Sequence, residues 1–226
     1  MLFVLNVPFI CKFLIFKKLV VVVACNNTAQ YSIMGGNTGY YISSNNGASW
    51  TFTSLSSKVN GVAVSSNGQY MFICQYNNAG TSKGIYHSSN YGALWNYISL
   101  ATVQTFTSIC CSANGEYVYT VSEYGLKIST TYGSSFINST FTSSSLNINC
   151  NSSGAVVLVT TTQSGLFISY DYGLTFTPMS GGGVGPLCIS NDGSRLFSAV
   201  GTNDNPNTGV WYSHNYGATW TFVSTS

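Results

Sequence analysis

The segment SSNYGALW, residues 88–95, is one of five stretches with a common pattern. A serine is followed two positions later by a short polar residue, then after two more positions by a glycine, and after three more by an aromatic residue. The other four are SSNNGASW (43–50), STTYGSSF (129–136), SYDYGLTF (169–176) and SHNYGATW (213–220). We call these five segments the boxes. Because they begin at residues 43, 88, 129, 169 and 213, the chain repeats with a period of 40 to 45 residues.

A second signal precedes each box and supports the same period. It reads VSSNGQY (64–70), CSANGEY (111–117), CNSSGAV (150–156) and ISNDGSR (189–195), and CNNTAQY (25–31) fits the same frame before the first box. Two signals in constant order define five units of about 40 residues, a period typical of solenoids, propellers and arrays.

Within a unit, the apolar residues alternate and the turns are of the hairpin kind. The second unit divides into GVAV (61–64), QYMFIC (69–74), GIYHS (84–88) and ALWNYIS (93–99), which are short runs rich in Val, Ile, Tyr and Phe. Such runs, bounded by Asn-Gly turns, predict four antiparallel strands, and no window has a helical period. Four strands per unit make one propeller blade.

The sequence therefore predicts an all-β protein, a β-propeller of about five four-stranded blades over residues 20–226, preceded by an apolar segment of unexplained role over residues 1–19. Five units fill the span, so we expect the first and last blades to meet. The alternative is that the chain is part of a larger propeller and that residues 1–19 replace or remain from a missing blade.

Each box is predicted to build the turn between the third and fourth strands of its blade. The short polar side chain should accept hydrogen bonds from backbone two residues on, the glycine should take a positive φ, and the aromatic residue should begin the outer strand and pack within or between blades. These residues are Asn45, Gly47 and Trp50; Asn90, Gly92 and Trp95; Gly133 and Phe136, with Thr131 at the polar position; Asp171, Gly173 and Phe176; and Asn215, Gly217 and Trp220.

The boxes resemble the Asp-box (BNR) repeat, Ser-x-Asp-x-Gly-x-Thr-Trp, over about residues 20–226. The resemblance implies a propeller. It does not specify a function, because Asp-box propellers include sialidases, xyloglucan-degrading hydrolases, sorting receptors, a photosystem assembly factor and uncharacterised extracellular or viral proteins. The aspartate is kept only at Asp171, and asparagine at three other boxes preserves the acceptor oxygen.

Composition excludes several classes of partner. Only 5% of residues are charged and the net charge is +2, so the chain has no basic stripe for nucleic acid. Lys12, Lys17 and Lys18 interrupt the apolar N-terminal stretch, and its longest uncharged run, residues 1–11, is too short to span a membrane.

A secreted protein remains an alternative. Residues 22–25 resemble a lipoprotein cleavage site, although the apolar region before it, residues 19–23, is shorter than a signal peptide requires. Sequons at Asn26, Asn138 and Asn151 favour an extracellular, periplasmic or virion-associated location, although a chain this rich in Asn, Ser and Thr produces such matches by chance.

The seven cysteines form neither a CxxC pair nor a metal-ligand pattern with histidine. Most of them fall at one position of the first strand of a unit, in the pairs Ala24–Cys25, Ala63–Val64, Cys110–Cys111, Asn149–Cys150 and Cys188–Ile189. Small buried thiols explain this column, and the alternative is a ring of metal-binding thiols. We predict no metal and no cofactor. His87 aligns with the isoleucines at 42, 128 and 168, and His214 lies in a box, so neither has a catalytic partner.

If the protein binds a partner, we expect the partner on the end of the propeller opposite the boxes, where the loops vary most in length. The candidate partners are a protein or a glycan, since Tyr, Asn and Ser suit stacking and hydrogen bonding. The candidate ligand-binding residues are Tyr76, Asn77, Asn78, Lys83, Glu123, Tyr124, Asn203 and Asp204. The competing interpretation is that these are ordinary surface loops.

The numbers of arginine and carboxylate side chains limit which enzyme mechanisms this chain can support. A sialidase needs a cluster of arginines for its substrate carboxylate, and Arg195 is the only arginine, which excludes that mechanism. A glycoside hydrolase needs two carboxylates on one face. Only Glu123 and Asp204 share the loop end, and they belong to non-adjacent blades. We therefore predict a non-catalytic binding or structural module, with a hydrolase using Glu123 and Asp204 as the alternative.

Overall fold

The computed structural model describes residues 20–76, 84–98, 100, 104–163, 165–200 and 209–224, and within these residues it is entirely β-structure. Five four-stranded antiparallel sheets follow one another along the chain, each with its strands in sequence order. This is the β-propeller that the repeats predict. The blades are as follows: blade 1, β1 (Val20–Cys25), β2 (Ser32–Gly36), β3 (Gly39–Ser43) and β4 (Thr51–Ser54); blade 2, β5 (Val59–Val64), β6 (Met71–Gln75), β7 (Ile85–Ser88) and β8 (Asn96–Ile98); blade 3, β9 (Phe106–Cys111), β10 (Val118–Ser122), β11 (Gly125–Ser129) and β12 (Ile137–Asn138); blade 4, β13 (Ser145–Cys150), β14 (Val157–Thr161), β15 (Leu166–Ser169) and β16 (Thr177–Pro178); and blade 5, β17 (Leu187–Ile189), β18 (Leu196–Val200), β19 (Gly209–Ser213) and β20 (Thr221–Ser224).

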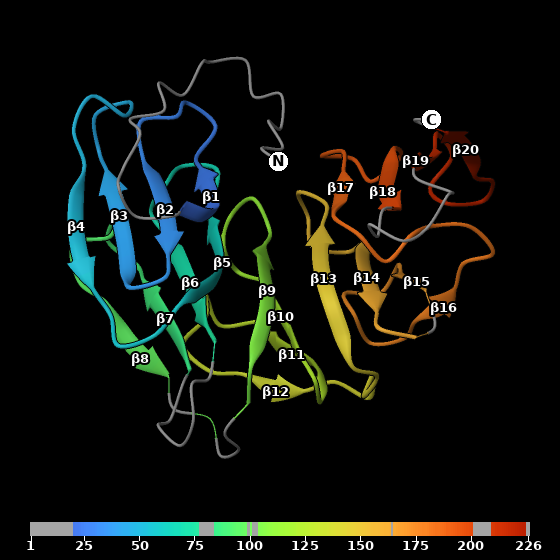
Figure 1. The fold of residues 1–226 in the computed structure, drawn as a ribbon, viewed down its shortest axis with the longest axis horizontal. Coiled ribbons are helices and arrows are strands. Elements are labelled where there is room, and N and C mark those ends of the chain that lie inside the picture. The colour runs from blue at the N-terminus through green and yellow to red at the C-terminus, as the bar shows by residue number, and fades with distance from the viewer. Residues whose placement is uncertain are drawn as a thin grey trace.

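The blades form an arc from β1–β4 through β9–β12 to β17–β20 (Figure 1). The innermost strand of each blade packs against that of the next, so that β1 contacts β5, β5 contacts β9, β9 contacts β13 and β13 contacts β17. Within the described residues, no contact of comparable extent joins β1 to β17. The meeting of first and last blades that we expected from counting units is therefore not seen. The reason is that equal repeats fix the contact between neighbours but not the angle between them.

Hydrogen bonds between neighbouring innermost strands reinforce this contact. The Asn60 side-chain amide donates to the Phe106 carbonyl at 2.8 Å, and the Thr107 hydroxyl donates to the Ser145 carbonyl at 3.0 Å. Asn147 and Asn149 donate in the same way to the carbonyls of Gly185 and Leu187 in blade 5. Polar side chains near the axis thus link successive blades.

The hydrophobic core lies between successive blades, in the interfaces that we call seams. The second strand of a blade contributes most to it, because this strand has neighbours on both faces. Phe72 of β6, Tyr119 of β10 and Leu158 of β14 occupy equivalent positions and face the following blade, and all three are fully buried. In blades 2 to 5, the aromatic residue of the box packs into the seam with the preceding blade. Trp95, for example, lies 5.2 Å from Tyr40 between ring centroids. These aromatic residues therefore pack between blades.

The boxes form the predicted turns, with one correction to their hydrogen bonding. The Asp171 carboxylate accepts from the backbone N–H of Thr175, four residues on, at 2.9 Å rather than two residues on. The contact two residues on is made by the box serine, since Ser169 Oγ accepts from the N–H groups of both Asp171 and Gly173. The polar side chain at the third box position thus closes the larger loop, from its own residue to the residue four positions on. The outer strand begins one residue after the aromatic residue.

Box glycines take positive φ values, from 77° at Gly133 to 85° at Gly217, as predicted. The residue before each glycine does so too, and in four boxes it is a tyrosine: Tyr91, Tyr132, Tyr172 and Tyr216. Three of these rings pack against a tyrosine ring of the preceding blade. The pairs are Tyr31–Tyr91, Tyr70–Tyr132 and Tyr117–Tyr172, with centroids 4.6 to 4.7 Å apart. The repeat therefore encodes contacts between blades as well as turns.

Candidate binding face

The candidate binding face is the end of the propeller formed by the β2–β3, β6–β7, β10–β11, β14–β15 and β18–β19 connections, opposite the boxes. Of the eight residues predicted there, Tyr76, Glu123 and Tyr124 belong to the described part of the chain, on adjacent blades 2 and 3. The other five, Asn77, Asn78, Lys83, Asn203 and Asp204, lie outside the described residues.

Glu123 and Tyr124 form the tip of the β10–β11 hairpin in blade 3. Both carboxylate oxygens of Glu123 accept a hydrogen bond from the backbone N–H of Thr105 at 3.0 Å. The hairpin is further held by the Ser122 hydroxyl, which donates to the side-chain oxygen of buried Gln104 at 2.8 Å and accepts from the N–H of Tyr124. Tyr124 is 64% exposed. Glu123 thus fixes the loop, and the tyrosine ring stands on it as an accessible contact surface.

Tyr76 lies at the corresponding place on blade 2, directly after β6. Its backbone N–H donates to the carbonyl of Lys58 at 2.9 Å, and its side chain is 41% exposed. Directly before it, Gln75 is 2% exposed, and its Nε2 has no hydrogen-bond partner among the described residues. Ser57, two residues before β5, is also 2% exposed, and its Oγ is likewise unpaired.

Gln75 in blade 2 corresponds to Ser122 in blade 3, since each pairs with the first residue of the innermost strand. Ser57 likewise corresponds to Gln104, because each lies two residues before that strand. In blade 3 the equivalent side chains bond to each other, whereas in blade 2 both keep a buried polar atom without a partner in the described structure. Buried polar groups are normally satisfied, and an unpaired one costs about 1–3 kcal/mol. Hydrogen-bonding capacity therefore remains beside the exposed Tyr76 ring.

Sequence reasoning missed Gln75 and Ser57. Gln75 is the last residue of a strand that otherwise reads as apolar, and Ser57 lies in a polar run between blades, so neither stands out by type. Comparison of the repeats, position by position, was the available signal, since Gln75 aligns with Gly36, Ser122 and Thr161.

The remaining described carboxylates are used in turns at the box end. Asp171 and Asp192 accept hydrogen bonds from serine and threonine hydroxyls and from backbone N–H groups, and these bonds lower the pKa of each carboxyl to about 2. Glu116 accepts from the Asn114 amide at 3.0 Å. A carboxyl with such a low pKa is a poor general acid near neutral pH. Asp171 and Asp192 are therefore suited to holding turns.

The described cysteines, histidines and sequons lie at the strand and turn positions that the repeat indicates. Across the described ranges, no three His, Cys, Asp or Glu side chains gather as a metal site requires. His87 is buried in the seam, and burial lowers its pKa.

Asn26 and Asn151 are buried, and their side-chain oxygens accept turn hydrogen bonds, whereas Asn138 is exposed. In the described residues we find no helix with the length and apolarity needed to cross a bilayer.

The solved structures similar to this fold include β-propellers of two kinds. A GH74 enzyme from Niastella koreensis is 18% identical, with a TM-score of 0.68, over 90% of this chain and 38% of its own. The GH74 xyloglucanase from Xanthomonas campestris is 12% identical, with a TM-score of 0.71, over 92% of this chain and 38% of its own. A YCF48 structure bound to D1 peptide is 14% identical, with a TM-score of 0.60, over 92% of this chain and 82% of its own.

These likenesses establish the class of protein, a β-propeller, at identities that show the fold alone. This chain spans little more than a third of the GH74 chains and most of the YCF48 chain. No protein-family model and no curated protein matches the sequence.

Proposed function

We propose that this protein is a non-catalytic binding module that engages a polypeptide partner through the loop end of blades 2 and 3. The observation that carries the proposal is the combination, at one place, of the exposed Tyr76 ring with the buried, unpaired polar atoms of Gln75 and Ser57. Both atoms are shielded from solvent, so a partner bonds to them only when the Gln75 and Ser57 side chains turn outward on binding. A polypeptide backbone then offers both acceptors and donors, and aromatic rings are enriched at protein interfaces.

Two further observations support this proposal. Tyr124, on the neighbouring blade, adds a second exposed ring on a loop that Glu123 ties to Thr105, so the loop itself needs little ordering on binding. One structurally similar propeller, YCF48, is bound to a peptide. The boxes, which we propose to be divergent Asp-box repeats, supply the scaffold for this surface.

The alternative is a glycoside hydrolase using Glu123 and Asp204. The contacts of Glu123 speak against it, because both of its oxygens accept from the backbone N–H of Thr105 in the connection between blades 2 and 3. A nucleophile or general base needs an oxygen directed at the substrate.

The test is a selection from a displayed random-peptide library, followed by affinity measurement for the enriched peptide. Tyr76→Ala and Tyr124→Ala should each weaken binding by about tenfold or more, which corresponds to about 1.4 kcal/mol. Tyr216→Ala is the matched control, because this ring is 48% exposed at the opposite end of the propeller and should not affect binding.

Parallel screens address the other outcomes. A glycan array that gives binding sensitive to Tyr76→Ala, with no enriched peptide, would replace the polypeptide with a sugar as partner. Hydrolysis of aryl-glycosides that is abolished by Glu123→Gln in a folded protein would overturn the non-catalytic proposal.

A further inference from the structure

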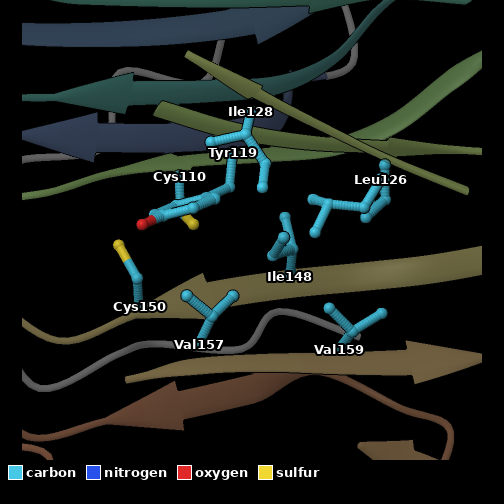
Figure 2. Close-up of a cluster of buried hydrophobic side chains, with 9 residues drawn as sticks. Cys110, Tyr119, Leu126, Ile128, Ile148, Cys150, Val157 and Val159 are labelled. Atoms are coloured by element: carbon cyan, nitrogen blue, oxygen red, sulfur yellow. The ribbon is translucent and has the colours of Figure 1, made fainter. Parts of the chain in front are cut away.

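Two cysteines from neighbouring blades face each other across one seam. Cys110 of β9 pairs in register with Tyr119, a position directed toward the following blade, and Cys150 of β13 pairs with Val157, a position directed toward the preceding blade. Both thiols belong to the apolar cluster that fills the seam between blades 3 and 4, and each residue is 8% exposed. Figure 2 shows the two side chains pointing toward each other beside the Tyr119 ring.

The other described seams do not contain such a pair. At the same two positions, the seam between blades 1 and 2 has Ala24 and Val64, and the seam between blades 2 and 3 has Ala63 and Cys111. The seam between blades 4 and 5 has Asn149 and Ile189. The staggered cysteine column of the sequence therefore brings two thiols face to face at a single seam of the described structure.

The pair lies among apolar side chains and beside the Tyr119 ring. The Cys150 thiol lies close enough to raise the pKa of the Cys110 thiol, and both are free cysteines. The Tyr119 hydroxyl donates to the Gly154 carbonyl at 2.8 Å. Cys111 follows Cys110 on the strand and, by the alternation of β-strands, points to the opposite face, toward blade 2.

We propose that Cys110 and Cys150 are a redox-sensitive pair that forms a disulfide between blades 3 and 4. Each thiol loses a proton and one electron, the S–S bond forms, and the two electrons and two protons pass to a diazene oxidant, whose N=N bond is reduced to the hydrazine. A thiol reductant reverses the step. The bond would join β9 to β13 and so fix this seam covalently.

Burial sets the rate of this reaction. Removal from water raises the pKa of the Cys110 thiol well above its usual range, and the neighbouring Cys150 raises it further. Because the thiolate is the reactive form, oxidation should be slow in the folded protein and faster when the seam opens transiently.

The test is oxidation of the whole chain with the diazene diamide, followed by peptide mass spectrometry and by titration of the remaining thiols in denaturant. Wild-type protein should yield a linked peptide pair joining the segment around Cys110 to the segment around Cys150. Its Tm should rise by roughly 5–10 °C after oxidation and return on treatment with dithiothreitol.

Four single variants identify the partners. Cys110→Ser and Cys150→Ser should remove the linked peptide and the rise in Tm, whereas Cys111→Ser and Cys188→Ser should retain both. The proposal is overturned if the link persists in Cys110→Ser and disappears in Cys111→Ser, or if wild-type protein forms no link even in mild urea. The wild-type measurements stand by themselves should a variant fail to fold.

Discussion

Phe197 of β18 occupies the same position in blade 5 that Phe72 of β6 occupies in blade 2, but Phe72 is fully buried and Phe197 is 39% exposed. Both rings point toward the following blade. Blade 3 covers Phe72, whereas no described blade follows blade 5. The same side chain in the same register thus has a different environment because of its place in the series.

Replacing these two phenylalanines measures that difference. Phe72→Ala should cost about 3–5 kcal/mol of unfolding free energy, since it empties a packed site. Phe197→Ala should cost about 1 kcal/mol, because much of its ring is already in water. Chemical denaturation of both variants gives the values. Equal losses would mean that another element covers Phe197 in solution.

The box glycines allow a separation of backbone strain from contact between blades. A Cβ at Gly133 would lie 2.5 Å from Phe72 Cε1 in the preceding blade, whereas one at Gly47 would meet only its own Trp50 ring at 3.7 Å. Both residues have a φ near 78°. We expect Gly133→Ala to cost about 2–4 kcal/mol and Gly47→Ala about 1 kcal/mol. Similar losses measured by thermal unfolding would show that the contact between blades does not matter.

The two turn aspartates should make stability fall in acid. The folded-state pKa of Asp171 and of Asp192 is about 2, below the unfolded value of about 3.9, so the unfolded chain binds more protons between these values. Their contribution is complete above about pH 4 and is lost as the pH falls toward 2. The double variant Asp171→Asn/Asp192→Asn should flatten the dependence of Tm on pH in that window. Asp171→Ala, unlike Asp171→Asn, should also cost about 1 kcal/mol at neutral pH.

His87 should make stability fall in a second, higher pH range. Burial lowers its pKa below the ordinary value of 6.5, and its Nδ1 has no partner in the described structure. The unfolded chain therefore takes up a proton first, and stability decreases as the pH falls below about 6.5. His87→Ile, which copies Ile128 and Ile168, should remove this decrease and stabilise the protein by about 1 kcal/mol at pH 7. The exposed His214, changed to Asn, should leave the decrease in place.

The repeats predicted the fold because each box combines a turn, a strand boundary and a contact with the neighbouring blade in eight residues. The glycine of the second box, Gly92, has the positive φ that its spacing indicated, and Trp95 packs in the seam. The hydrogen-bond partner of the third box position was wrong by two residues. A side chain's reach depends on the shape of the turn, which a pattern does not contain.

The candidate binding face was less predictable. The sequence singled out Tyr76 and Tyr124 because they lie in variable loops, and both are exposed. It also suggested Glu123 as a ligand or a catalyst, but its bond to Thr105 depends on the path of the connection between blades 2 and 3. The pairing of the residue at the Gln75 position depends in the same way on a distant residue, since its counterpart Ser122 bonds to Gln104, 18 residues away. Local patterns carry no information about such long-range contacts.

The polar links between innermost strands bear on how the molecule comes apart. Blade 3 receives a link from Asn60 on one side and gives one from Thr107 on the other, while blade 5 is linked on one side only within the described structure. In a linear array each unit is stabilised by its nearest neighbours. Amide hydrogens of β10 should therefore exchange with deuterium more slowly than those of β18, and cooperative unfolding should start at the outer blades and move inward.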